Sequence, residues 1–567
     1  MKTRMLDERP TAMNDAGQWT LEGDWETACG VSETLCLRGR QAATAWAAGS
    51  MGAAWFLSLR VRIDDPGTDG EGTAEILLGD GEHSPLLRLG VEVSYGTFSQ
   101  ITFSSGEAAR PGDLIRSGLL PGEDREFFFT LWKAEGESPL NVVVFGDQGL
   151  SYAFTAEGQE EKASRCTELG LRVTGVVAEF ARIERTADCR AEGPYLDRAR
   201  QAVYDLLGHF WEGGPATGHM KPTWCGYPSS VLPDPRGGLW ERGMILFCMD
   251  SLYQITGDPM IRERIVSEWT RIKELYTAEE LEAAGTNLHP AVDDCAWHAM
   301  LYLMCYRYTG DEVALDRATG MVYKTFDHYG DDALGGGLWY NNTRKYKSLY
   351  QVLLLLDCWR IVQYRPDDEL MARVLFQAEW MEEHLLREDK AYWCEVDENG
   401  PRGQGRPNNV REAGSSSFFG GNTGMAVLWA RLYRTTGEEK YRERAVRTAQ
   451  AICRVFCNDG RYLNDRDAWV NGTFMQFYAT EVLTLPEIPR ECIDMTYRTA
   501  ASIYENARTP DGYYGGCWNG PADGPRSAWS RIGSRPQQTM TSGSTVNMMM
   551  GAALLEAMGI PSSEETA

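Results

Sequence analysis

The sequence has 567 residues, with 81 Asp and Glu against 56 Lys and Arg and a formal net charge of −25 at pH 7. This length is more than one hydrophobic core normally serves, so two or three domains are expected. The negative charge repels polyphosphate, and no dense run of Lys and Arg reverses it locally. The sequence therefore predicts no nucleic-acid partner and no partner at an anionic membrane surface.

The first residues, MKTRMLDERPTAMNDAGQW, lack the apolar core of a secretory signal, and the chain has no run of 18 or more apolar residues. Its 14 cysteines are spread along the sequence, many of them inside apolar helical patterns, as is typical of reduced thiols. Together these features predict a cytoplasmic protein. Cys453 and Cys457 have no second pair of ligands at zinc spacing, so no metal site is predicted, and no cofactor is indicated.

From Trp19 to Ala187 the chain alternates apolar and polar residues in short runs such as AWFLSLRVRI, TAEILLG and LNVVVFGD. Polar or Gly-containing links such as DDPGTDGEGT separate these runs. This pattern predicts an antiparallel β-sandwich over residues 1–192. The order of the runs resembles a concanavalin-type jelly roll, which implies a lectin-like accessory domain, although no ligand set stands out in it.

From Gly193 onward the apolar period becomes helical and stays so. Segments with a charged face, such as EEKYRERAVRTAQAICRVF, alternate with segments that are apolar almost all round, such as YQVLLLLDCWRI. Six pairs of an inner apolar helix and an outer amphipathic helix predict an (α/α)6 barrel over residues 193–567. The twelve expected helices cover residues 196–212, 237–255, 258–276, 290–308, 311–329, 346–363, 367–386, 417–436, 438–457, 472–486, 490–508 and 537–558.

Three segments, LYQITGDPMIRERI, CYRYTGDEVALDRA and LYRTTGEEKYRERA, repeat one junction between helices. In each, a buried helix ends in Thr-Gly, where Gly can adopt the left-handed conformation, and an acidic residue opens the next helix. Each junction therefore predicts a tight hairpin from an inner to an outer helix. An open solenoid of hairpins is the alternative architecture, but its terminal helices would need polar outer faces.

The long connections of such a barrel gather at the amino ends of the inner helices. Here they are rich in Gly, Trp, Tyr, Asn, Asp and Arg, as in GGGLWYNNTRK and YYGGCWNGPADGPRSAWS. Aromatic faces stack on sugar rings and polar side chains bind hydroxyl groups, so the pattern predicts a carbohydrate site. For any single Trp, packing alone is an equally good explanation.

Asp293 and Asp294, in the stretch NLHPAVDDCAWHAM, fall at the same mouth of the barrel. The helix macrodipole also stabilises acidic side chains near a helix start, and Pro290 suits the first helical position. A purely structural role of the two aspartates is therefore the alternative. Adjacent helical residues splay by about 100° and can address opposite sides of one glycosidic bond. Retaining glycosidases hold two carboxyl groups about 5–5.5 Å apart, and adjacency favours that short separation. The charge of one carboxylate also raises the pKa of its neighbour, so one of the two carboxyl groups stays protonated near neutral pH.

Five blocks carry a resemblance to a known family: VDDCAWHAMLYLMCYRYTGD, GGGLWYNNTRKYKS, FFGGNTGMAVLWARLYRTTGEEKYRERA, LNDRDAWVNGTFMQFYATEVL and ENARTPDGYYGGCWNGP. In this order they resemble glycoside hydrolase family 76, the endo-α-1,6-mannanases, from about Gly193 to Gly559. The resemblance implies a retaining attack on an α-mannoside, with Asp293 as nucleophile and Asp294 as acid/base. The side chains expected to bind the oligosaccharide substrate are those of Trp240, Trp297, His298, Trp339, Tyr340, Asn422 and Trp518.

The sequence departs from the family pattern at three positions. His298 stands where the family commonly has a second aromatic residue, and Ser348 and Gln351 stand where it usually has asparagines. These exchanges alter the expected sugar-contacting edge, so a different α-linked glycan is the alternative substrate. Two other (α/α)6 enzymes are alternatives, namely a sugar epimerase, which the scarcity of histidine disfavours, and an unsaturated glucuronyl hydrolase. The latter needs a basic pocket, for which the candidates are Arg236, Arg242, Arg402 and Arg411.

A glycan-binding protein without activity is the alternative from another functional class. It predicts that neither aspartate of the pair is needed for function. The sequence does not indicate the sugar linkage, endo or exo action, or the oligomeric state.

Overall fold

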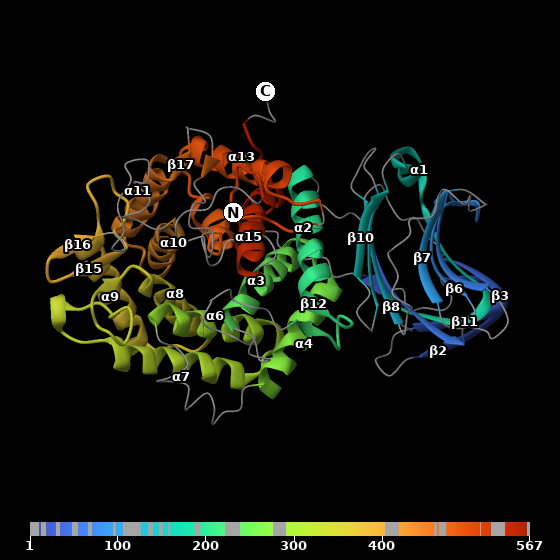
Figure 1. The fold of residues 1–567 in the computed structure, drawn as a ribbon, viewed down its shortest axis with the longest axis horizontal. Helices are drawn as coiled ribbons and strands as arrows, with labels where there is room; N and C mark the ends of the chain where they lie inside the picture. Colours follow the sequence, from blue (N-terminus) through green and yellow to red (C-terminus); the bar gives the residue numbers. More distant parts are fainter. Residues whose placement is uncertain are drawn as a thin grey trace. The chain divides into compact units, whose positions relative to one another are not determined.

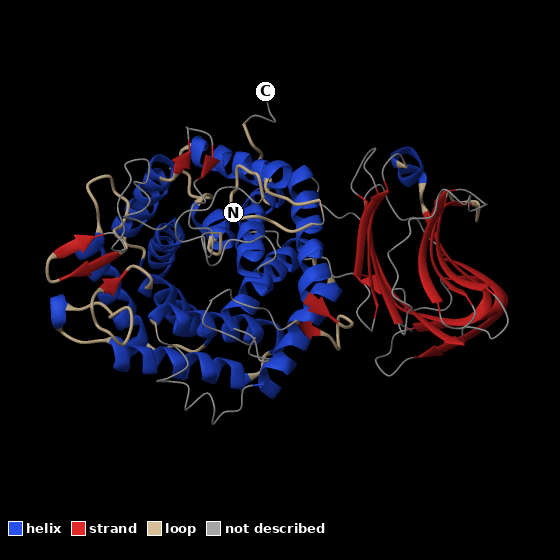
Figure 2. Ribbon diagram, in the orientation of Figure 1, coloured by secondary structure: helices blue, strands red, loops and turns tan. Residues whose placement is uncertain are grey.

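The chain divides into two compact units in the computed structural model. The first comprises Met1–Gly193, Leu207–His219 and Thr256–Arg264, and the second comprises Pro194–Leu206, Met220–Ile255 and Ile265–Ala567. Strands dominate the first unit and helices the second (Figure 2). The division into residues 1–192 and 193–567 stays a prediction. The structure describes residues 11–12, 19–29, 35–47, 55–65, 71–94, 98–105, 126–133, 140–146, 151–156, 159–187, 193–221, 239–275, 291–402, 419–458, 462–463, 472–510, 512–522 and 539–563.

The strands of the first unit form one antiparallel sheet around a single hydrophobic core. Alternate residues of each strand point into that core, as Leu57, Leu59 and Val61 do, because strand side chains have a period of two. The strands are β1 (Thr11–Ala12), β2 (Trp19–Cys29), β3 (Leu35–Ala47), β4 (Trp55–Asp65), β5 (Glu71–Gly79), β6 (Pro85–Ser94), β7 (Phe98–Ser105), β8 (Glu126–Lys133), β9 (Leu140–Gly146), β10 (Ser151–Ala156) and β11 (Glu168–Ala187), with the short helix α1 (Glu160–Arg165) before β11.

Strand β11 joins the two arms of this sheet (Figure 1). From Glu168 to Thr174 it pairs with β5, and after an irregularity between Thr174 and Val177 it pairs with β4. The arms β5–β6–β7 and β4–β8–β9–β10 diverge from this point. The predicted antiparallel β-rich region is confirmed, whereas the jelly-roll sandwich stays a prediction.

From Pro194 onward the helices alternate between an inner and an outer position, as predicted (Figure 1). The inner helices are α3 (Leu239–Thr256), α6 (Val292–Thr309), α8 (Gln351–Tyr364), α10 (Phe419–Thr436), α12 (Met475–Phe477) with the π-helical turn η4 (Tyr478–Val482), and α15 (Thr539–Ala557). The outer helices are α2 (Pro194–Phe210), α4 (Pro259–Leu275), α7 (Glu312–Tyr329), α9 (Asp368–Leu385), α11 (Glu439–Val455) and α13 (Arg490–Asn506). Their bounds lie within a few residues of the predicted ones, except that a π-helical turn replaces the end of the predicted helix 472–486. None of the described helices is long and apolar enough to cross a membrane.

The inner helices close into a ring. Helix α6 packs on α8, α8 on α10, α10 on η4, and η4 on α15. The Asn547 amide of α15 donates to the Met244 carbonyl of α3 at 3.0 Å, and Phe247 of α3 contacts Trp297 of α6. This closure confirms the predicted barrel and excludes an open solenoid.

The Thr-Gly junctions form the predicted hairpins between inner and outer helices. Gly257, Gly310 and Gly437 have φ values of 67°, 65° and 72°, which glycine adopts at little cost. At the second junction the Thr309 hydroxyl accepts the amide of Asp311 at 3.2 Å, and the Asp311 carboxylate accepts the amide of Val313 at the start of α7. Local bonding of this kind ends one helix and begins the next.

Short elements complete the chain from Pro194 onward. The strand pairs are small and lie in connections between helices. They are β12 (Trp211–Glu212) with β13 (His219–Met220), β14 (Lys347–Ser348) with β15 (Glu395–Asp397) and β16 (Gly400–Arg402), and β17 (Cys457–Asn458) with β18 (Tyr462–Leu463); a 3-10 turn, η2, covers Ala333–Gly335.

Candidate active site

The acidic pair lies in the first turn of α6, as predicted. Ala291, the residue before the helix, is extended, and its side chain offers no cap. The Val292 amide of the helix instead donates to the Tyr340 carbonyl oxygen at 2.8 Å. Ala291 also forms an antiparallel bridge with Asn341. The connection between α7 and α8, which contains Tyr340, therefore fixes the helix end that carries the pair.

The two carboxyl groups differ from ordinary acids at a helix start. Both residues keep some exposed surface, yet Asp293 Oδ1 is buried and has no hydrogen-bond partner among the described residues. Burial and the neighbouring charge of Asp294 raise the pKa of Asp293 well above its usual value. Burial also raises the pKa of Asp294 to about 6. A solvated helix start would instead favour the charged carboxylates, so helix electrostatics alone does not explain this pair.

Tyrosine side chains lie against the pair. Negative charge on Asp293 is the main cause that raises the pKa of Tyr340, which places this phenol near that carboxyl group. The Tyr340 ring stacks on Tyr346 at a centroid distance of 5.3 Å and contacts Tyr350 at 5.5 Å. Burial, followed by nearby negative groups that include both aspartates, raises the pKa of Tyr329 at the end of α7. The connection between α7 and α8 thus forms one wall of the candidate site.

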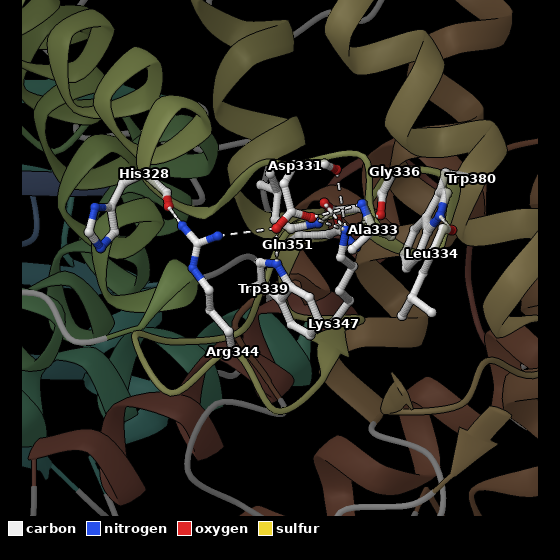
Figure 3. A network of polar contacts seen from close by, with 12 residues as sticks. His328, Asp331, Ala333, Leu334, Gly336, Trp339, Arg344, Lys347, Gln351 and Trp380 are labelled. Atoms are coloured by element: carbon white, nitrogen blue, oxygen red, sulfur yellow. Dashed lines mark hydrogen bonds and ion pairs between the residues drawn. The ribbon is translucent and has the colours of Figure 1, made fainter. Parts of the chain in front are cut away.

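A buried lysine holds this connection together (Figure 3). The Lys347 ammonium donates to Asp331 Oδ1 at 3.0 Å and to the carbonyl oxygens of Ala333 at 2.5 Å, Gly336, and Gly337 at 3.1 Å. Its side chain is 0% exposed. Burial lowers the pKa of Lys347 below its usual value, although the hydrogen bond to Asp331 opposes this shift. Because one buried ammonium satisfies several oxygen atoms at once, the segment Asp331–Lys347 is held in one arrangement.

The three consecutive glycines of this connection are required by its backbone. Gly335, Gly336 and Gly337 have φ values of 74°, 134° and 77°, a region that side chains disfavour. A Cβ atom on Gly337 would also lie 2.5 Å from the Trp380 ring. The Gly-Gly-Gly block therefore encodes the turn that lets backbone carbonyls converge on Lys347.

Trp339 belongs to the lysine network. Its indole donates to Asp331 Oδ2 at 2.6 Å, and its ring centroid lies 5.0 Å from the Lys347 ammonium (Figure 3). Its neighbour Tyr340 is instead coupled electrostatically to Asp293, so the two adjacent residues serve different parts of the connection. A contact between Trp339 and a sugar stays a prediction.

Trp297 and His298 follow the pair on α6, and both are buried. Trp297 lies one turn after Asp293 on the same side of the helix. Its ring centroid is 6.3 Å from that of Phe474 and 6.2 Å from that of Phe247, so it packs α6 against neighbouring inner elements. Contacts of Trp297 and His298 with a substrate also stay predictions.

Two of the expected binding residues lie in the interior. Asn422 is fully buried, and its Oδ1 accepts the Tyr392 amide at 2.9 Å. Trp518 is fully buried as well, and its indole donates to Thr545 Oγ1 at 3.2 Å. Both side chains anchor neighbouring connections in this structure, and contacts of Asn422 and Trp518 with a substrate stay predictions. Trp240 lies in the first turn of α3, and its side chain is outside the described residues.

The exchanges at Ser348 and Gln351 are internal too, because both side chains are fully buried. Gln351 Oε1 accepts the Leu338 amide at 3.1 Å, and Gln351 Nε2 donates to the Ser348 carbonyl at 3.0 Å. These two residues brace the α7–α8 connection. They do not form the sugar-contacting edge that the sequence suggested.

The basic pocket of the uronate alternative finds no support in Arg242. This residue is buried and paired with Glu268, which also accepts the Met220 amide at 2.8 Å. Because Glu268 already compensates this guanidinium, Arg242 is not presented to a ligand. Arg236, Arg411 and the side chain of Arg402 lie outside the described residues.

Sequence reasoning did not single out Lys347 or Tyr329. Part of the signal was present, because a Gly-Gly-Gly turn leaves carbonyl oxygens that need donors, and Lys347 is the nearest buried donor along the chain. The identity of the acceptors depends on how the connection folds back. A pattern of residue types does not contain that information.

The arrangement supports acid–base and nucleophilic chemistry. Two adjacent carboxyl groups with raised pKa values retain a proton at a pH where ordinary aspartates have lost theirs. The pair can therefore present one carboxylic acid and one carboxylate to the same bond. Among the residues described above, no group of three or more His, Cys, Asp or Glu side chains is placed to hold a metal ion.

Solved structures resemble this chain at low sequence identity. A family 76 glycoside hydrolase from a bovine Bacteroides thetaiotaomicron strain has a TM-score of 0.50 at 12% identity, covering 94% of this chain and 99% of its own. A second structure is an inactive α-1,6-mannanase variant from Salegentibacter sp. HEL1_6, with adjacent aspartates replaced by asparagine, in complex with α-1,6-mannotriose. Its TM-score is 0.49 at 16% identity, and the match covers 64% of this chain and 99% of the mannanase. The mannosidase Bt3792 from Bacteroides thetaiotaomicron VPI-5482 has a TM-score of 0.49 at 14% identity, with the same coverage.

No curated protein matches the chain in sequence. The model of Glycosyl hydrolase family 76 matches residues 195–552, which is more than half of the chain and contains the acidic pair, the α7–α8 connection and the ring of inner helices. The chain therefore belongs to glycosyl hydrolase family 76, and it is a glycoside hydrolase.

Proposed function

We propose that this glycoside hydrolase cleaves an α-linked mannooligosaccharide, with α-1,6-mannosides as the leading substrates, and that it retains the anomeric configuration. The observation that carries the proposal is the acidic pair at the start of α6, where burial raises both pKa values. Family membership supports hydrolysis of a glycosidic bond. The mannanase and mannosidase named above, which share the fold class, suggest the sugar.

In the proposed reaction one carboxylate attacks the anomeric carbon while the other, protonated carboxyl group gives its proton to the departing glycosidic oxygen. The C–O bond to the leaving sugar breaks as the bond to the carboxylate forms. The second carboxyl group, now ionised, then takes a proton from water, whose oxygen displaces the enzyme from the anomeric carbon. Two displacements restore the original configuration.

The roles within the pair follow the family resemblance, with Asp293 as nucleophile and Asp294 as acid/base. The two carboxyl groups are adjacent, and the charge of Asp294 raises the pKa of Asp293, so the remaining proton belongs to the pair. The experiment below tests which aspartate attacks and which one donates the proton.

The test is a panel of defined α-linked oligosaccharides, led by α-1,6-mannooligosaccharides, with product configuration followed by NMR. We expect cleavage of one linkage with an initial α-configured product. Azide added to Asp293→Ala should yield a β-glycosyl azide, because the anion enters the vacated nucleophile position, and azide added to Asp294→Ala should yield an α-glycosyl azide. Exchanged products would reverse the two roles. An initial β-product from the unaltered enzyme would refute retention, and no cleavage of any mannoside would refute the sugar.

The pH dependence should reflect both raised pKa values. Activity needs one ionised carboxylate. Because burial raises the pKa of Asp294 to about 6, kcat/KM is expected to rise as the pH passes that value and not near the ordinary aspartate pKa of 3.8. It should fall again at higher pH, when the second proton is lost. Initial rates from pH 3.5 to 9, with unfolding monitored at each pH, measure the profile. An acidic limb near pH 4 would contradict it.

A further inference from the structure

Two cysteines from neighbouring outer helices, Cys453 and Cys492, form what we call the thiol pair. Cys453 lies in the last turn of α11 and Cys492 in the first turn of α13, and these two helices pack on each other. Cys492 Sγ is 3.8 Å from the carbonyl oxygen of Ala449, which lies one turn before Cys453 on the same side of α11. The Cys453 thiol donates a hydrogen bond to the Cys492 sulfur. Both residues are reduced in the structure.

A tyrosine from an inner element lies beside the thiol pair. Tyr478 begins the π-helical turn η4 and is 1% exposed. Burial raises the pKa of Tyr478, and the nearby sulfur atoms of Cys453 and Cys492 raise it further, which places the phenol against both of them. The hydroxyl group of Tyr478 has no hydrogen-bond partner among the described residues. A buried hydroxyl without a partner is costly, so an oxygen atom formed at the sulfur atoms would satisfy it.

The thiol pair differs in its protonation from other buried thiols of the chain. The hydrogen bond from Cys453 is the main cause that lowers the pKa of Cys492, and the amino end of α13 also favours a thiolate. Burial instead raises the pKa values of Cys248, Cys305 and Cys358. Because the thiolate is the nucleophilic form, Cys492 is the most reactive of these thiols.

We propose that the thiol pair is an oxidation site, at which hydrogen peroxide converts Cys453 and Cys492 into a disulfide that links α11 to α13. The Cys492 thiolate attacks one peroxide oxygen, the O–O bond breaks, and hydroxide leaves a sulfenic acid on Cys492. The Tyr478 hydroxyl donates to the oxygen of that sulfenic acid. The Cys453 sulfur then attacks the Cys492 sulfur, the S–O bond breaks, and the departing hydroxide takes the Cys453 proton to form water.

The disulfide fixes one part of the ring of inner helices. It closes a loop of about 40 residues, and a crosslink of that length stabilises the folded chain by restricting the unfolded one. The loop contains α12, η4 and Phe474. The Phe474 ring stacks on Trp297 of α6, the helix that carries the acidic pair. Oxidation therefore strengthens the part of the ring that packs against this helix.

Hydrogen peroxide added to the reduced full chain tests the proposal. The remaining thiols are then alkylated, and the unreduced peptides are mapped by mass spectrometry. We expect a linked pair of peptides that joins Cys453 to Cys492, and a Tm that rises by several degrees and returns to its starting value after dithiothreitol. Alkylation of both cysteines, sulfinic acid at either one, or a disulfide between Cys453 and Cys457 would each overturn the proposal.

Variants locate the crosslink. Cys453→Ser and Cys492→Ser should each abolish the rise in Tm, whereas Cys457→Ser should keep it. Cys517→Ser is the matched control, because Cys517 is a partly exposed, reduced thiol in another connection, and it should behave as the unaltered protein does. Tyr478→Phe should form the disulfide about tenfold more slowly, since the sulfenic acid loses one hydrogen bond; an unchanged rate would remove Tyr478 from the site. A rise in Tm that survives in Cys453→Ser or Cys492→Ser would refute the crosslink, and if neither variant folds, the peptide map of the unaltered protein still decides.

Discussion

Asp293→Asn and Asp294→Asn are each expected to reduce hydrolysis by roughly 10³-fold or more and, at the same time, to raise Tm at pH 8. Both carboxyl pKa values are raised in the folded state by burial. Such a group stabilises the fold fully below its unfolded pKa near 4, and this contribution is lost as the pH rises through the folded pKa. At pH 8 the buried pair is therefore a cost to stability, and a neutral amide removes part of that cost.

Rates on the cleaved oligosaccharide and unfolding curves at pH 4 and pH 8 measure both effects. The gain in Tm should be present at pH 8 and nearly absent at pH 4, where the unaltered pair is protonated. Asp327→Asn is the matched control, because its side chain is 74% exposed at the end of α7, and it should change neither quantity. Activity that survives in either variant of the pair would contradict the catalytic assignment. Equal Tm gains at pH 4 and pH 8 would contradict the explanation that the gain comes from removing a buried charge.

Lys347→Met should lower both stability and activity although Lys347 does not contact the pair. The exchange leaves Asp331 Oδ1 and the carbonyls of Ala333, Gly336 and Gly337 without their buried donor. Loss of one partner from such a cluster typically costs about 3 kcal/mol. The freed segment also positions Tyr340 against Asp293, and a displacement of about 1 Å near reacting groups can cost roughly 10²-fold in rate.

A structural role and a positioning role of Lys347 can be told apart. Lys347→Ala leaves a space lined by oxygen atoms, so added methylammonium should restore part of kcat, with KM little changed. Lys345→Met is the control, because Lys345 is exposed two residues earlier in the same connection. If Lys347→Met unfolds at lower temperature but keeps full kcat and an unchanged pH profile below its Tm, the lysine braces the fold without orienting the pair.

The helices and the position of the acidic pair could be predicted from sequence because both depend on local signals. A buried helix with apolar residues all round and an outer helix with one charged face differ in composition, and Thr-Gly marks each junction between them. Asp293 and Asp294 could be placed in a first turn for the same reason. Their helix start follows the extended residue Ala291 and precedes a long apolar run.

The side chains around the pair could not be predicted in the same way. Trp339 and Tyr340 are adjacent, and which of them faces Asp293 depends on how the connection pairs with itself through Lys347 and Asp331. Asn422 and Trp518 belong to blocks that resemble the family, but a block records only that a residue type is needed. Whether such a residue anchors a buried group or binds a sugar is decided by tertiary packing, and in the structure both side chains are buried and hydrogen-bonded to neighbouring segments.

The bond between the Val292 amide and the Tyr340 carbonyl also bears on how the enzyme matures during synthesis. Helix α6 leaves the ribosome well before the connection that completes its first turn. A nascent chain that ends before Tyr340 lacks the carbonyl oxygen that accepts the Val292 amide. The first turn of α6, which carries the acidic pair, is therefore completed only after the first part of the connection between α7 and α8 has been synthesised.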